Sequence, residues 1–203
     1  MERCLIIVDV QNDFCPGGAL AVAEGDKVVP VINRISSKFD KAVATQDWHP
    51  LGHVSFASTH KKSPFEVIDV GGVQQTLWPD HCVPGTSGAD FHRDLDTRKV
   101  DLIIRKGTNP LVDSYSAFLE NDRKTETGLR FYLQGLSLTD LYLTGLATDY
   151  CVYYSALDAL DFGFRVTVVL DATRGVDVPP GNVEKTVENM RRRGINLTDH
   201  RSL

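Results

Sequence analysis

The sequence is poor in cysteine, with only four such residues among 203. Cys4, Cys15, Cys82 and Cys151 form no C-x-x-C pair. A chain of this length buries enough surface to fold without a disulfide framework. We therefore expect four free thiols and a cytoplasmic, reduced protein.

Long apolar runs and concentrated positive charge are also missing. No apolar run approaches the ~20 residues of a membrane helix. The first one, residues 4–10, is short and contains Asp9, which argues against a signal-peptide core. The formal net charge of −5 argues against a nucleic-acid partner. The basic run at 191–193 ends a helical pattern, so we expect it to be solvated and to complement the helix dipole. The terminal Arg201-Ser202-Leu203 lacks the basic middle residue of a peroxisomal signal, and its role stays open.

Several well-known catalytic motifs are absent as well. The sequence contains no G-x-x-x-x-G-K-[ST] or G-x-G-x-x-G loop, no H-E-x-x-H and no G-x-S-x-G. These absences argue against the common nucleotide-binding loops, a thermolysin-like zinc helix and a serine nucleophile elbow.

What is present is a regular alternation of strand and helix patterns. Buried strands are expected at 5–8, 41–45, 101–105, 141–146 and 165–170. Helices are expected at 26–39, 128–135, 150–161 and 183–193. Residues 47–99 are weakly periodic, and long irregular stretches in compact domains are usually functional. The alternation predicts one domain, residues 1–203, with a three-layer α/β/α sandwich around a mainly parallel sheet.

Chemically capable residues follow several of these strands. Ligands of parallel sheets bind beyond the carboxyl ends of the strands, where Asp9, Asp47, Lys106 and Cys151 are all expected. At a helix start Cys151 would have a lowered thiol pKa and nearby backbone donors for an oxyanion. The alternative is a small buried core cysteine. Asp9 suits a general base or a loop cap, and Lys106 would keep it ionised while favouring a thiolate.

A second group of residues has the chemistry of a metal site. Asp47 and His49 are two residues apart, so they lie on the same side of an extended segment, and His81 follows later. Two imidazoles and one carboxylate leave open positions on zinc, iron or manganese. Ordinary polar loop residues are the alternative. His53 and His60 are candidates for outer positions around the ion.

Five segments together resemble the nicotinamidases of the isochorismatase-like cysteine hydrolase superfamily. They are LIIVDVQNDF at 5–14, TQDWHP at 45–50, WPDHCV at 78–83, RKG at 105–107 and GLATDYCV at 145–152. The segments occur in the order typical of the family and cover most of the chain from position 4 to position 170. Residues 113–127 fit less well.

The resemblance implies a fold, an activity and a set of site residues. It implies the isochorismatase-like hydrolase fold and conversion of nicotinamide to nicotinic acid and ammonia through a cysteine thioester, in NAD salvage. It implies an Asp9, Lys106 and Cys151 triad, and an oxyanion hole at Ala147 and Cys151 beside a cis Leu146–Ala147 peptide. It also implies one divalent metal ion, zinc first with iron or manganese as alternatives, on Asp47, His49 and His81. Phe14 and Trp78 would flank the substrate ring, with Ser114, Tyr115 and Ser116 as further contacts.

Two other functions stay open at this point. An amidase acting on ureido or carbamoyl groups is disfavoured because such relatives generally lack the metal residues. A non-catalytic metal- or ligand-binding domain would keep the same fold without the reaction. The sequence fixes neither the metal, nor activity on analogues such as pyrazinamide, nor whether the chain forms a homo-oligomer.

Overall fold

A six-stranded sheet forms the centre of the computed structural model, which describes residues 2–203. Its strand order is β5-β2-β1-β6-β7-β8, and every neighbouring pair is parallel. The strands are β1 (Arg3–Val8), β2 (Lys41–Asp47), β5 (Leu102–Lys106), β6 (Asp140–Leu146), β7 (Arg165–Arg174) and β8 (Asn196–Thr198). The helices are α1 (Val28–Ile35), α2 (Leu129–Gly135), α3 (Tyr153–Asp161) and α4 (Asn182–Arg192).

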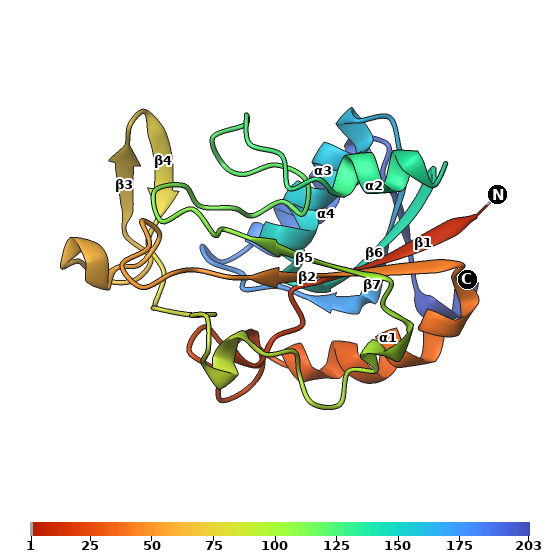
Figure 1. Ribbon diagram of the computed structural model, residues 1–203, viewed down its shortest axis with the longest axis horizontal. Helices are drawn as coiled ribbons and strands as arrows, with labels where there is room; N and C mark the ends of the chain where they lie inside the picture. The colour runs from red at the N-terminus through yellow and green to blue at the C-terminus, as the bar shows by residue number, and fades with distance from the viewer. Residues whose placement is uncertain (1) are drawn as a thin grey trace.

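Helices cover both faces of this sheet (Figure 1). On one face Leu5 and Ile7 of β1 pack in a cluster with Val28 and Ile32 of α1. The alternate residues Cys4, Ile6 and Val8 pack with apolar side chains of α2, α3 and α4 on the other face. Because successive strand residues point to opposite faces, a strand covered on both sides must be apolar throughout. The predicted three-layer α/β/α sandwich is confirmed.

The expected elements are present with shifted ends, and three features were not expected. The predicted helix at 26–39 is α1 flanked by short 3-10 helices at Gly25–Lys27 and Ser36–Lys38. The irregular stretch contains a hairpin of β3 (Val67–Val70) and β4 (Val73–Thr76), which projects from the sheet in Figure 1. A short edge strand, β8, follows α4. The predicted helix at 150–161 begins as a π-helix, Thr148–Val152, which contains Cys151 and leads into α3.

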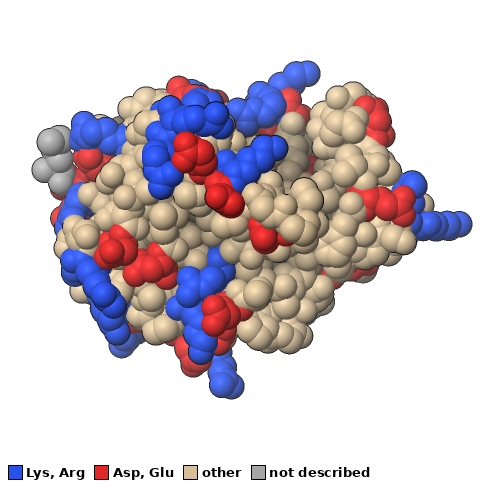
Figure 2. Space-filling model, turned by 180° about the vertical axis from the view of Figure 1, so that it is seen from behind, with Lys and Arg blue, Asp and Glu red and all other residues tan. Residues whose placement is uncertain are grey.

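The molecular surface carries charged residues of both signs (Figure 2). On the face drawn there, Lys and Arg side chains alternate with Asp and Glu. The basic run at 191–193 is exposed, as expected, and Arg191 and Arg193 pair with Glu188 and Asp161. Among residues 2–203, no helix combines the length and the apolar composition needed to cross a bilayer.

One glycine of β6 is required by its contact with β1. Gly145 has a φ of +102°, and a Cβ there would lie 2.8 Å from Val8 N. Both the backbone conformation and the contact exclude a side chain. We expect Gly145→Ala to lower the free energy of unfolding by about 3 kcal/mol or more, measured by urea denaturation. Gly135→Ala at the end of α2 is the matched control, since its Cβ would meet nothing within 4 Å. A Gly145→Ala variant as stable as this control would contradict the expectation.

Candidate active site

Three buried polar side chains converge where β1, β5 and β6 end. Lys106 Nζ, at the end of β5, lies 2.9 Å from Asp9 Oδ2 and 3.5 Å from Cys151 Sγ. It also pairs with Asp47 and donates to Ser114 O at 2.8 Å. The exposed fractions of Asp9, Lys106 and Cys151 are 0%, 1% and 6%. The structure therefore brings the three predicted residues together.

The orientation of Asp9 is fixed by a threonine of the neighbouring strand. Thr45 Oγ1 accepts from Asp9 N at 3.2 Å, so its own proton is directed to Asp9 Oδ1, 2.6 Å away. Because Oδ1 is held in this way, Oδ2 is the oxygen that faces Lys106. Asp9 has a φ of 47°, and the chain therefore turns sharply at the end of β1.

Burial controls the ionisation of this group. Burial raises the pKa of the Cys151 thiol well above its usual range, although Lys106 acts to lower it. The expected lowering of the thiol pKa is therefore wrong, because burial outweighs the cation. Burial also raises the pKa of Asp9, again against the effect of Lys106. A carboxylate with a raised pKa is a better base, and it lies beside a thiol that has to lose a proton.

The residues expected to bind an oxyanion lie at the end of β6. The Leu146–Ala147 peptide is cis, as the family resemblance implies. Ala147 and Cys151 line the same pocket. Ala147 O accepts hydrogen bonds from the backbone N–H groups of Tyr150 and Val152. This turn places the nucleophile candidate directly beyond the strand.

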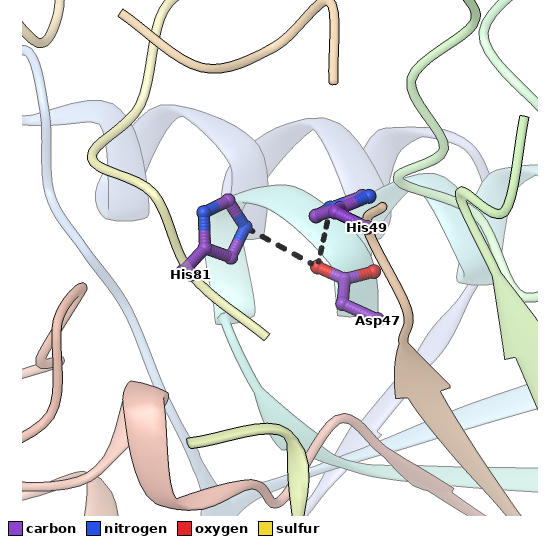
Figure 3. Close-up of side chains that lie close together, drawn as sticks. All are labelled: Asp47, His49 and His81. Carbon is purple, nitrogen blue, oxygen red and sulfur yellow. Dashed lines mark ion pairs between the residues drawn. The ribbon is translucent and has the colours of Figure 1, made fainter. Parts of the chain in front are cut away.

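Asp47, His49 and His81 form a compact group of possible metal ligands (Figure 3). Asp47 Oδ2 lies 3.5 Å from His49 Nε2 and 3.7 Å from His81 Nε2. Each Nδ1 lies beside a backbone carbonyl, Gly107 O at 3.0 Å for His49 and Pro79 O at 2.7 Å for His81. A carbonyl only accepts, so each Nδ1 carries a proton, and Nε2 is the ring nitrogen left for a metal ion. These donor atoms fit a divalent cation of the zinc, iron or manganese type.

The charges around the proposed metal ligands favour the ionised form of Asp47. Burial acts to raise the pKa of Asp47, but Lys106 and His49 outweigh it and hold that pKa well below its ordinary range. An ionised carboxylate is the form that binds metal.

The two remaining histidines of this region have other partners. His53 stacks on His49 with ring centroids 4.2 Å apart, and its nitrogens lie beside Ser55 Oγ and Val112 O. Burial, and then the neighbouring His49, lower the pKa of His53 to about 4. His60 Nε2 donates to Val54 O at 2.8 Å. His53 therefore stacks on a candidate ligand ring and forms a second group of possible ligands with His49 and Asp113, whereas His60 is engaged elsewhere.

Asp113 is a buried acidic neighbour that sequence reasoning missed. Its Oδ1 lies 3.9 Å from His49 Nε2, and it accepts hydrogen bonds from Gln75 Nε2 and Ser114 N. Gln75 belongs to the unexpected β3–β4 hairpin, whose strands flank a Gly71-Gly72 turn typical of hairpins, but nothing in that pattern places Gln75 beside Asp113.

A small, partly open pocket joins the two groups. Phe14, Trp78 and Tyr115 line it as expected, and Trp78 Nε1 donates to Tyr115 OH at 3.2 Å. Ser114 and Ser116 are not among its lining residues, and Ser114 instead offers its carbonyl to Lys106. Leu20, Tyr150 and Val176 also line the pocket and were not predicted.

Comparison with known proteins identifies the family. The isochorismatase domain model matches residues 3–202. The chain belongs to this family. A nicotinamidase of Escherichia coli strain K12 is 45% identical over 199 residues, covering 96% of this chain and 93% of the relative. A nicotinamidase of Saccharomyces cerevisiae is 34% identical over 214 residues, covering 97% and 99%.

Solved structures of this isochorismatase family agree with the fold. The Acinetobacter baumanii nicotinamidase/pyrazinamidase matches with a TM-score of 0.97 at 45% identity, covering 99% of this chain and 97% of that one. The pyrazinamidase of Pyrococcus horikoshii in complex with zinc matches with a TM-score of 0.80 at 38% identity, covering 98% and 99%. The predicted family membership is confirmed.

Proposed function

We propose that this isochorismatase-family chain is a nicotinamidase that hydrolyses nicotinamide to nicotinic acid and ammonia. One observation carries the proposal: a buried Asp9–Lys106–Cys151 group and a separate Asp47–His49–His81 group meet at one small aromatic pocket. The first group suits attack on a carboxamide, and the second suits capture of a ring nitrogen. Relatives named nicotinamidase, 45% identical over nearly the whole chain, support it.

The reaction follows from the positions of the chain's own residues. Asp9 takes the proton of Cys151, and the thiolate attacks the carboxamide carbon. The oxyanion is stabilised by the backbone N–H groups of Ala147 and Cys151. Asp9 returns the proton to the leaving nitrogen, the C–N bond breaks, and ammonia departs from a Cys151 thioester. Asp9 then deprotonates a water molecule that attacks the thioester, which releases the acid and restores the thiol. Lys106 remains a cation throughout and balances the negative charge.

The remaining residues hold the substrate in place. Asp47, His49 and His81 would bind one divalent ion, zinc first with iron or manganese as alternatives. Such an ion supplies a Lewis-acid position for the pyridine nitrogen. Phe14 and Trp78 would flank the ring. We further propose that residues 1–203 act as one domain and that the reaction serves NAD salvage.

A comparison of two amides tests the proposal. Nicotinamide and benzamide have the same shape, but benzamide lacks the ring nitrogen. We expect kcat/KM for nicotinamide to exceed that for benzamide by on the order of 100-fold or more, measured as ammonia release.

Controls distinguish cysteine-dependent hydrolysis from binding of the amide without reaction. Cys151→Ser should release essentially no ammonia from either amide. Equal rates for the two amides would contradict anchoring of the ring nitrogen. Binding of nicotinamide without any ammonia release would instead favour the non-catalytic alternative.

A further inference from the structure

The segment after β7 forms one wall of the proposed substrate pocket. Val176 is half-buried and packs against the apolar cluster that contains Phe14 and Leu20. It lines the pocket together with Cys151. The next residue, Asp177, is exposed. The position of Val176 therefore depends on what holds the backbone of residues 175–178.

Asp149 holds that backbone. Its carboxylate accepts hydrogen bonds from Val176 N at 2.9 Å, Asp177 N at 3.0 Å and Asn182 Nδ2 at 3.0 Å. Asp149 is 2% exposed, and a buried carboxylate requires such donors. Removing the carboxylate would leave two backbone N–H groups of the pocket wall without these partners.

Neighbouring residues complete the attachment. A Cβ on Gly175 would overlap Val183 Cγ2 and lie 3.0 Å from Asp149 Oδ1, so a side chain there would push on both neighbours. Tyr150 OH donates to Val178 O at 2.8 Å. Asp149 and Tyr150 belong to the same π-helix as Cys151. The turn that carries Cys151 thus also holds the backbone of residues 176–178.

We propose that Val176 sets the size of ring substituent that the pocket accepts, and that Asp149 is the positioning residue for Val176. This inference rests on the proposed function. A pyridine ring whose nitrogen faces Asp47, His49 and His81, and whose carboxamide carbon meets Cys151, has its C4–C5 edge on the remaining side. With Phe14 and Trp78 over the ring faces, that edge would face the remaining lining side chains, Leu20, Tyr115, Tyr150 and Val176, and the proposal assigns it to Val176.

A size series at Val176 tests the first part. The measurement is the ratio of kcat/KM for 5-methylnicotinamide to kcat/KM for nicotinamide. Val176→Ala removes two methyl groups and should raise this ratio about tenfold or more, whereas Val176→Leu adds a methylene and should lower it by a similar factor. The ratio does not depend on the fraction of folded enzyme, so loss of stability alone leaves it unchanged.

Asp149 variants test the second part with the same ratio. Asp149→Asn keeps one acceptor oxygen and Asp149→Ala keeps none, so the ratio should rise in the order wild type, Asn, Ala. Asp158→Asn is the matched control. Asp158 is an equally buried carboxylate of α3 that pairs with Arg123, away from the pocket lining, and its loss should leave the ratio unchanged.

The outcomes separate the two proposals. A ratio that stays constant across the Val176 variants, in an enzyme that hydrolyses nicotinamide, would overturn the inference alone. The ratio could respond to Val176 substitutions and yet be the same in both Asp149 variants as in wild type. That result would show that Asp149 does not position Val176. A wild-type protein that releases no ammonia from nicotinamide would overturn the proposed function, and this inference with it.

Discussion

Replacement of Lys106 by methionine is expected to lower kcat/KM for nicotinamide by on the order of 10³-fold or more. The same change should lower the unfolding free energy of the metal-free protein by about 3–5 kcal/mol. The Lys106 side chain is 0% exposed and lies between Asp9 and Asp47. Burial acts to lower its pKa, but the two carboxylates outweigh it and raise that pKa well above the ordinary value. Lys106→Met therefore leaves two buried carboxylates without their shared cation, which urea denaturation and steady-state kinetics would both register.

Activity alone cannot tell whether Lys106 only supports the fold or also acts on the nucleophile. Its charge works against the effect of burial on the Cys151 thiol, so in Lys106→Met the apparent pKa of that thiol should rise further. The measurement is the rate of alkylation by a small reagent across a pH series, with circular dichroism to confirm folding. Cys151→Ser must remove the signal. A folded Lys106→Met variant whose thiol titrates as in wild type would restrict Lys106 to a structural role.

Lys41→Met serves as the matched control. Lys41 also pairs with an aspartate, Asp101, at 2.7 Å, but its side chain is 38% exposed. Exposed pairs contribute little because solvent screens them. This variant should keep both the activity and the thiol titration of wild type.

The central sheet and the residues beyond its strands were predictable because their signals are local. An uninterrupted apolar run such as that of β1 has to be covered on both faces, which predicts a parallel strand. Asp9, Asp47 and Lys106 then fall at strand ends, and the parallel order alone places such ends along one edge of the sheet. The register confirms this for one pair, since Asp47 lies opposite Lys106.

The rest of the pocket could not be predicted because it depends on contacts between distant segments. Val176 follows a strand that continues to Arg174, four residues past the predicted end, and its place is fixed by Asp149. Asp113 is held by Gln75 of the β3–β4 hairpin, whose VIDV-GG-VQQT sequence is typical of a hairpin but gives no indication that it packs beside Asp113. The direction of the thiol pKa was mispredicted for a similar reason. A helix start was visible in the sequence, but the burial of Cys151 was not.

Removal of the metal is the second change with a large expected effect. Dialysis against a strong chelator should abolish most hydrolysis of nicotinamide, and zinc, iron or manganese salts should restore it.

His49→Ala or His81→Ala leaves one imidazole and one carboxylate, too few for a stable site. Either variant should retain less than about a tenth of the wild-type metal, measured by elemental analysis. His60→Ala is the matched control, since His60 bonds Val54 O and belongs to no ligand group among residues 2–203.

The two-amide comparison gives this prediction a second readout that does not depend on total activity. If the ion binds the ring nitrogen, the preference for nicotinamide over benzamide should exist only in the metal-loaded protein. In the chelated protein, and in His81→Ala, both amides would be held only by their ring faces against Phe14 and Trp78. Their residual kcat/KM values should then agree within about threefold, because the Lewis-acid position for the ring nitrogen is lost. A metal-free protein that still prefers nicotinamide would show that another group of the pocket recognises the ring nitrogen.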